Sequence, residues 1–179
     1  MKKLMLVLLL VFALPLYGGS IVQAQALPKS VVVVLTGTAT GEFREIRGTT
    51  MDCFDVDMMD PVSGRILGSG TDCLDLASIA LIGGGPGFTI DNTQFFHFPE
   101  GTLVTEIVTN IQETGAAASP SVTHITGAVS TVGVNQVVDG DGRYKNAQGR
   151  VRLNGGADMS LFGGSNIITF DCVFRIDFD

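Results

Sequence analysis

A carboxylate and an amide on one predicted strand are the first candidates for chemistry. Glu106 and Asn110 stand four residues apart, so on a β-strand they share a face with Val104 and Val108. If that face lines an enclosed interior, its apolar neighbours favour a protonated carboxyl group that can transfer a proton, with Asn110 orienting it. If it is the outer face, both are ordinary solvated residues. The solvated alternative is favoured, because charged side chains are rarely buried.

Histidine supplies the third candidate. The chain contains two histidines, and His97 lies in the aromatic run from Gln94 to Pro99. A strand histidine of this kind is more often packed or hydrogen-bonded than reactive, so His97 is the reserve group for proton transfer. The sequence has no Gly-x-Ser-x-Gly, Cys-x-x-Cys, His-x-x-x-His, Gly-x-Gly-x-x-Gly or P-loop pattern. We therefore expect no cofactor and no metal ion.

Four aspartates lie close together in the sequence: Asp52, Asp55, Asp57 and Asp60. Carboxylate oxygens are preferred ligands of Ca²⁺, so a calcium site is one interpretation. Strand geometry argues against it, because Asp52 would point away from Asp55 and Asp57. We expect a solvated acidic surface instead.

Two of the three cysteines are predicted to form a disulfide. The segment from Asp60 to Gly64 has turn chemistry, and Cys53 and Cys73 lie at matched distances on its two sides. They should therefore face each other across an antiparallel hairpin, within the reach of a disulfide, whereas two free thiols are the alternative. Cys172 is expected to behave as a small buried hydrophobe.

The elements that position these residues are short β-strands. Gly, Pro and Asp clusters separate the β-rich runs, and no window shows helical spacing over three turns. Such runs are typical of a sandwich or a barrel. The sequence predicts an all-β fold, an eight-stranded antiparallel β-barrel, with a β-sandwich as the alternative, because closure removes exposed edges. The runs are Ser30–Thr38, Phe43–Met59, Arg65–Leu76, Phe88–Phe98, Thr102–Gln112, Ser121–Ser130, Gln148–Asn154 and Asn166–Phe178.

The last of these runs shows the clearest alternation. Phe170, Cys172, Phe174, Ile176 and Phe178 share one face, and the residues between them are mostly polar. We expect the aromatic face to enter the core.

The N-terminus has the order of a secretory signal peptide. Basic Lys2 and Lys3 precede an apolar stretch from Leu4 to Leu16, and small and polar residues follow. This stretch is shorter than the roughly 20 residues that span a bilayer, so a cleaved signal is favoured over an anchor. We assign residues 1–24 to the signal, with cleavage after residue 26 as the other option, and residues 27–179 to a single barrel domain. The protein should be secreted or periplasmic, without stable membrane insertion after cleavage.

The net charge disfavours one class of partner. The chain has 11 basic and 18 acidic residues and a net charge of −7, and loss of Lys2 and Lys3 takes the charge to −9. Nucleic acid is therefore not expected as a partner, because phosphate binding depends on clustered Lys and Arg.

The C-terminal half carries a distinctive segment: Val138-Asp139-Gly140-Asp141-Gly142-Arg143-Tyr144-Lys145-Asn146-Ala147-Gln148-Gly149-Arg150-Val151-Arg152-Leu153. It resembles the Gly-x-Gly-x-Phe/Tyr-x-x-Ala-x-Gly-x-Val segment of the allene oxide cyclase-like and dirigent-like barrels. The segments Thr93 to Val104 and Ile168 to Phe174 also look like those of exported bacterial proteins with such a domain. In the segment from Val138 to Leu153, Gly140 and Gly142 would permit a tight turn and Gly149 would allow close strand approach. Tyr144 would plug one end of the barrel.

The resemblance implies a function as well as a fold. It implies an eight-stranded barrel, commonly trimeric, whose lumen holds a hydrophobic small molecule and steers its reaction without a cofactor. The family's catalytic residues do not map onto positions of this chain, and one scaffold can host unrelated functions.

Two functions from different classes follow. The first is an exported barrel that binds an apolar small molecule in its lumen, with cofactor-free cyclase or isomerase activity as an extension. The alternative is a non-enzymatic structural or interaction protein of the envelope or extracellular space, whose barrel is filled by its own side chains. The lumen volume separates them, because small-molecule sites occupy a few hundred Å³ whereas packed cores leave only small voids.

The signal peptide gives a direct prediction. Small residues precede two overlapping cleavage positions, so the exported protein should begin at Gln25 or Leu27. N-terminal sequencing of exported material tests this, and a chain that still begins at Met1 would refute it.

Overall fold

The computed structural model describes residues 26–82, 87–113, 122–127 and 135–179. The predicted signal peptide lies outside these residues, apart from the second cleavage position. The described chain is almost entirely β-structure, in which short β-rich runs alternate with turns. The strands are β1 (Ser30–Thr40), β2 (Glu42–Ile46), β3 (Thr49–Met59), β4 (Ile66–Leu81), β5 (Phe88–Phe98), β6 (Gly101–Glu113), β7 (Val122–Gly127), β8 (Gln136–Gly140), β9 (Gly149–Asp158) and β10 (Ile167–Phe178).

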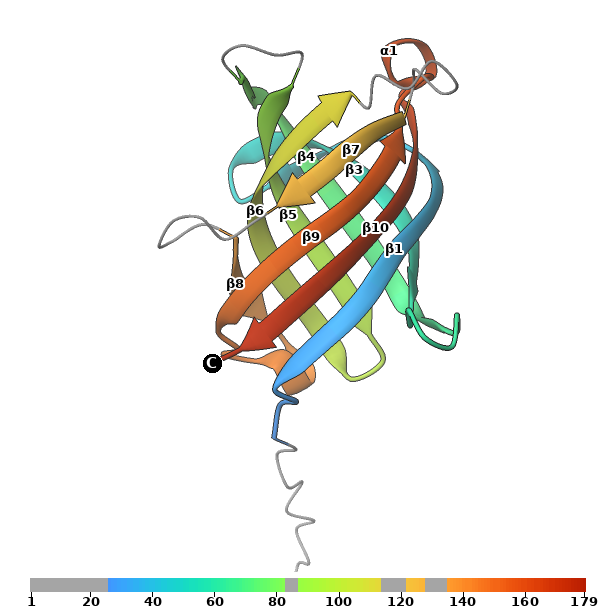
Figure 1. Ribbon diagram of the computed structural model, residues 1–179. Coiled ribbons are helices and arrows are strands. Elements are labelled where there is room, and N and C mark those ends of the chain that lie inside the picture. Colours follow the sequence, from blue (N-terminus) through green and yellow to red (C-terminus); the bar gives the residue numbers. More distant parts are fainter. Residues whose placement is uncertain (1–25, 83–86, 114–121, 128–134) are drawn as a thin grey trace, which may run out of the picture.

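These strands form a closed antiparallel barrel (Figure 1). The sheet runs β1-β10-β9-β7-β6-β5-β4-β3, and a pairing of β1 with β3 closes it. β8 pairs with β6 and β9, so β7 and β8 occupy successive parts of one position in the wall. The predicted eight-stranded antiparallel barrel is confirmed, with β2 lying outside the ring.

The interior is built by alternation along each strand. On β10, Phe170, Cys172, Phe174 and Ile176 are buried, as the sequence predicts, whereas Phe178 is only partly buried. At the end of the barrel near the C-terminus, Tyr144 packs against Phe98 and Phe178, with ring centroids 5.1 and 6.2 Å apart. This aromatic cluster fills that end, and the short helix α1 (Phe162–Ser165) lies at the opposite end (Figure 1).

The turn that includes Gly142 depends on a residue without a side chain. Gly142 has a φ of 52°, and a Cβ atom there would collide with the carbonyl oxygen of Glu100. At Gly149 a Cβ would meet the carbonyl oxygen of Asp177 on the neighbouring strand. Both positions therefore need the close backbone approach that only glycine allows.

Two elements differ from the sequence expectation. The single run predicted over Phe43–Met59 is wrong, because it is broken into β2 and β3 by a tight turn. Arg47 and Gly48 have φ values of 51° and 86°, and two positive φ angles are the mark of a type I′ hairpin turn. Strand β8, which includes Val138 and Asp139, is also absent from the predicted runs, because the glycines that follow it favour a turn.

The β2–β3 hairpin folds onto the outer face of the barrel. Met51, Cys53 and Cys73 form a second buried cluster there, against Ile46 and Phe95. Arg47 at the hairpin tip donates hydrogen bonds to Glu106 on β6 and Asp139 on β8, at 2.9 and 3.2 Å. The hairpin therefore lies as an arm across several strands of the wall.

The predicted disulfide between Cys53 and Cys73 is confirmed. The two residues are register partners across β3 and β4, on the outer side of the β3–β4 hairpin. Phe54, Val56 and Leu74 point the other way, into the core. Cys172 is the free cysteine of the described chain and is buried.

The disulfide should stabilise the folded state by restricting the unfolded chain. It closes a loop with a sequence separation of 20 residues, for which chain entropy gives about 3 kcal/mol. We expect the double variant Cys53→Ser/Cys73→Ser to lose roughly that much free energy of unfolding, measured by urea denaturation. The wild-type protein with added reductant should match it. A double variant as stable as the oxidised protein would contradict this account.

Candidate functional site

The structure places the predicted proton-transfer pair on the outside of the barrel. On β6, Leu103, Ile107 and Ile111 point inward and are buried, so Glu106 and Asn110 face outward. The side chain of Glu106 is 47% exposed and its carboxylate accepts a hydrogen bond from Arg47. Glu106 and Asn110 therefore do not line the lumen, which their proposed role in proton transfer requires. The alternative, in which both are on the outer face, describes them.

His97 also lies on the outer face. Its ring stacks against Phe95 at a centroid distance of 6.3 Å, and Nδ1 is 3.2 Å from the Thr102 hydroxyl. His97 pairs with Thr102, four residues from Glu106 along β6, which corresponds to a strand length of roughly 13 Å. The structure thus does not bring His97, Glu106 and Asn110 together in one site.

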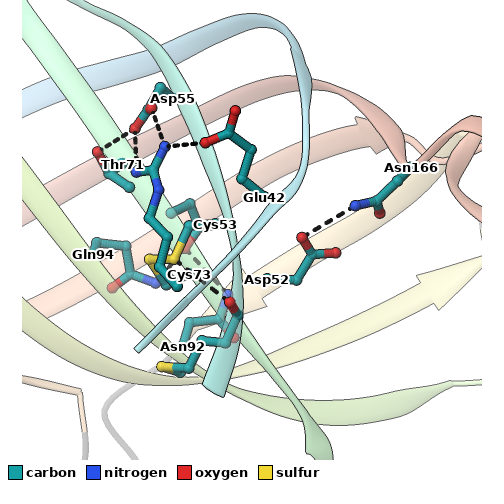
Figure 2. Close-up of a disulfide and its surroundings, with 12 residues drawn as sticks. Glu42, Asp52, Cys53, Asp55, Thr71, Cys73, Asn92, Gln94 and Asn166 are labelled. Carbon is teal, nitrogen blue, oxygen red and sulfur yellow. Dashed lines mark hydrogen bonds and ion pairs between the residues drawn. A yellow bond between two sulfur atoms is a disulfide. The ribbon is translucent and has the colours of Figure 1, made fainter. Parts of the chain in front are cut away.

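The four aspartates are dispersed, for the reason given by strand geometry, and the expectation of a solvated acidic surface is wrong for Asp52, which is buried. Asp52 is buried and accepts a hydrogen bond from Asn166, whereas Asp55 points away to Arg44 and Thr71 (Figure 2). Asp60 accepts hydrogen bonds from the Val62 and Ser63 backbone and from the Ser63 hydroxyl, which hold the pKa of its carboxyl below the usual value. No group of three or more His, Cys, Asp or Glu within the described chain is arranged to hold a metal ion.

A row of polar side chains crosses the inner wall instead. Asp72 on β4 is a register partner of Gln94 on β5, which is in turn a partner of Thr105 on β6. Thr105 donates to Gln94 Oε1 at 2.9 Å, and Gln94 Nε2 donates to Asp72 Oδ1 at 2.9 Å. Asn92 Nδ2 lies 3.4 Å from the same Asp72 oxygen. All of these side chains are buried, so the row is a connected hydrogen-bond network inside the barrel.

The row borders a small cavity in the half of the barrel near α1. Its volume is about 20 Å³, and its walls are apolar apart from Asp72, Asn92, Thr109 and the Cys172 thiol. Thr109 is 1% exposed, and neither its hydroxyl nor Asp72 Oδ2 has a hydrogen-bond partner among the described residues. A cavity of this size accommodates one water molecule, which could bridge these groups.

Burial shifts the acidity of two groups at the cavity. The pKa of Asp72 rises to about 6, chiefly because burial penalises the charged form, although hydrogen bonds from Gln94 and Asn92 oppose the rise. The pKa of Cys172 rises to about 12, through burial and then the neighbouring Asp72 charge. The thiol is therefore neutral and a poor nucleophile at neutral pH.

Sequence reasoning missed Asp72. Strand alternation places it on the same face of the β3–β4 hairpin as Phe54 and Leu74, which point into the core. The polar residues at register positions on β5 and β6 are the signal that identifies its partners. These residues can be matched to Asp72 only when the register between strands is known, and the sequence of one strand does not give that register.

A search of protein-family models finds no match to the chain, and no curated protein is significantly similar to it. No helix in the described part of the chain is long and apolar enough to cross a bilayer. The fold and the disulfide define the protein as a closed, disulfide-bonded antiparallel β-barrel.

The raised pKa of Asp72 predicts a specific pH dependence. The folded state retains the Asp72 proton up to about pH 6, whereas the unfolded chain loses it near pH 4, so stability should fall as pH rises between these values. Asp72→Asn removes this loss and retains an acceptor for Gln94. We expect it to exceed the wild type in unfolding free energy at pH 8 by roughly 2 to 3 kcal/mol and to converge with it at pH 4.

Urea denaturation at pH 4, 6 and 8 measures the effect. Asp171→Asn, on the outer face of β10, is the matched control and should follow the wild-type profile. If the unfolding free energies of Asp72→Asn and the wild type changed with pH in the same way, the buried carboxyl of Asp72 would not retain its proton up to about pH 6.

Proposed function

We propose that this protein is an exported, non-enzymatic binding protein that acts through its outer surface, with the barrel as a filled, rigid scaffold. The observation that carries the proposal is the lumen volume. The interior cavity measures about 20 Å³, whereas small-molecule sites occupy roughly 300 to 1,000 Å³. An apolar ligand of ordinary size has no room beside the side chains already present.

The packing of the interior supports this proposal. Phe54, Phe96 and Phe174 are fully buried inside the ring, and Tyr144 with its aromatic neighbours fills one end. Larger concave volumes lie on the outside, where a groove next to the β2–β3 hairpin measures about 320 Å³. The surface therefore offers the space that the lumen lacks.

Export is part of the proposal and has two supports. The N-terminal pattern is that of a secretory signal, and the Cys53–Cys73 disulfide suits an oxidising compartment. Among such compartments, the periplasm and the extracellular space fit equally.

The second candidate is binding of an apolar small molecule in the lumen, with cofactor-free cyclase or isomerase chemistry and a trimeric assembly. Likeness to the allene oxide cyclase-like and dirigent-like barrels suggests it. One observation favours it: Asp72 and Thr109 line a cavity that is apolar apart from these two residues, Asn92 and the Cys172 thiol, and they would hold the polar end of a ligand. This function requires the lumen to expand well beyond its observed volume.

Ligand occupancy distinguishes the two candidates. Native mass spectrometry of protein purified from the exported fraction of its own host should give the mass of the polypeptide alone. Titration with the fluorescent polyene cis-parinaric acid should show no saturable one-to-one binding. The Glu106→Gln variant should, like the wild type, show no saturable binding of cis-parinaric acid at any pH from 5 to 8.

The opposite result has a clear signature. One-to-one binding of cis-parinaric acid that falls at least tenfold in Thr109→Leu, which fills the cavity, but persists in Glu106→Gln would overturn the proposal. It would establish the lumen as the binding site.

A further inference from the structure

The largest unexplained feature near the β2–β3 hairpin is the groove between it and the outer wall, here called the outer groove. It has a volume of about 320 Å³ and is formed by the hairpin and by β4, β5 and β6. Its apolar lining includes Ile46, Met51 and Val108, and its carboxylates are Asp75, Asp91 and Glu106. The outer groove therefore combines apolar side chains with three carboxylates.

Only one of these carboxylates is neutralised. Glu106 forms a salt bridge with Arg47 at 2.9 Å, and Arg47 also binds Asp139 outside the groove. Within the described residues, neither Asp75 nor Asp91 forms a salt bridge. Asp75 accepts one hydrogen bond, from the backbone N–H of Ala77 at 3.0 Å. The groove thus retains two uncompensated negative charges.

The strand register forces these two charges together. Asp75 and Asp91 are direct cross-strand partners on β4 and β5, and like charges in such a pair are destabilising. Burial, followed by the charges of Asp75 and Glu106, raises the pKa of Asp91. A cation bound between the two carboxylates would remove this repulsion.

A hydroxyl on a buried residue provides an independent sign of a missing ligand. Thr93 follows Asp91 on the same face of β5, is only 6% exposed and lines the groove. No described residue forms a hydrogen bond with its hydroxyl, which is open to the groove rather than fully buried. An unpaired hydroxyl in a nearly closed position costs free energy unless a bound group or water satisfies it.

We propose that the outer groove binds a small organic diamine, with its ammonium groups at Asp75 and Asp91 and its carbon chain along the apolar wall. A metal ion fits less well, because the described chain has no group of three or more ligands arranged around one point. A diamine carries two positive charges and can neutralise both carboxylates of the pair, whereas a single ammonium group neutralises one charge. Thr93 can accept a hydrogen bond from an ammonium N–H. This inference rests on the proposed function at the outer surface and specifies its ligand.

Calorimetric and NMR titration of the exported protein with 1,4-diaminobutane tests the inference. We expect saturable one-to-one binding with a dissociation constant on the order of 1 mM and amide shifts concentrated along the groove. n-Butylamine should bind several-fold more weakly, and butan-1-ol should not bind. Because the contacts are ionic, raising NaCl from about 50 to 500 mM should weaken binding.

Matched variants locate the site. Asp75→Asn and Asp91→Asn should each weaken diamine binding about 3- to 10-fold, and the double variant should abolish saturation. Asp171→Asn removes one carboxylate from the outer face of β10, away from the groove, and should bind as the wild type. Equal weakening in Asp171→Asn, or unchanged binding in the double variant, would overturn the inference. So would the absence of saturation at 20 mM diamine.

The failure of this inference is separable from failure of the proposed function. If neither 1,4-diaminobutane nor cis-parinaric acid binds, the proposed diamine ligand is wrong but a function at the outer surface remains. A lumen that binds cis-parinaric acid would refute the proposed function, whatever the diamine result.

Discussion

Closure of the sheet into a ring is the constraint on which the rest of this structure depends. β1 meets β3 only from Val34↔Met59 to Thr36↔Asp57, yet this short pairing completes the barrel. At Gly37, with a φ of 135°, β1 turns away and continues along β10 alone. A ring of eight strands can be filled by side chains or can hold one small ligand, and in this barrel large side chains such as Phe54, Phe96 and Phe174 fill it. The interior is therefore a core, and the polar groups inside it need hydrogen-bond partners there.

The inner polar row meets this requirement through register rather than through sequence proximity. Asp72, Gln94 and Thr105 come from three consecutive strands and meet because each is the cross-strand partner of the next. Each hydrogen bond offsets part of the cost of removing these groups from water. The other carboxyl oxygen of Asp72 has no hydrogen-bond partner among the described residues, and burial raises the pKa of the group.

The eight-stranded barrel and the local pairing within one hairpin could be predicted from the sequence, but side-chain contacts that depend on the register of several strands could not. The Asp60–Gly64 turn sets the register of its hairpin, which is why the Cys53–Cys73 pairing follows from the sequence. The direction of Glu106 does not follow, because its strand carries apolar residues on both faces and buries the polar Thr105 and Thr109 inside. The turn at Arg47-Gly48 does not follow from the sequence, because β-rich sequence flanks it on both sides and its conformation requires an arginine at positive φ.

Closure also explains why the β2–β3 hairpin lies outside. Once β1 and β3 complete the ring, β2 has no neighbour available except β3, so its free edge would extend into solvent. Folding onto the wall buries Met51 and the disulfide, and the Arg47 salt bridges hold the tip in place. A groove of about 320 Å³ borders the arm, whereas the cavity inside the ring measures about 20 Å³. Because side chains fill the ring, the space that could admit a partner lies on the outside of the barrel.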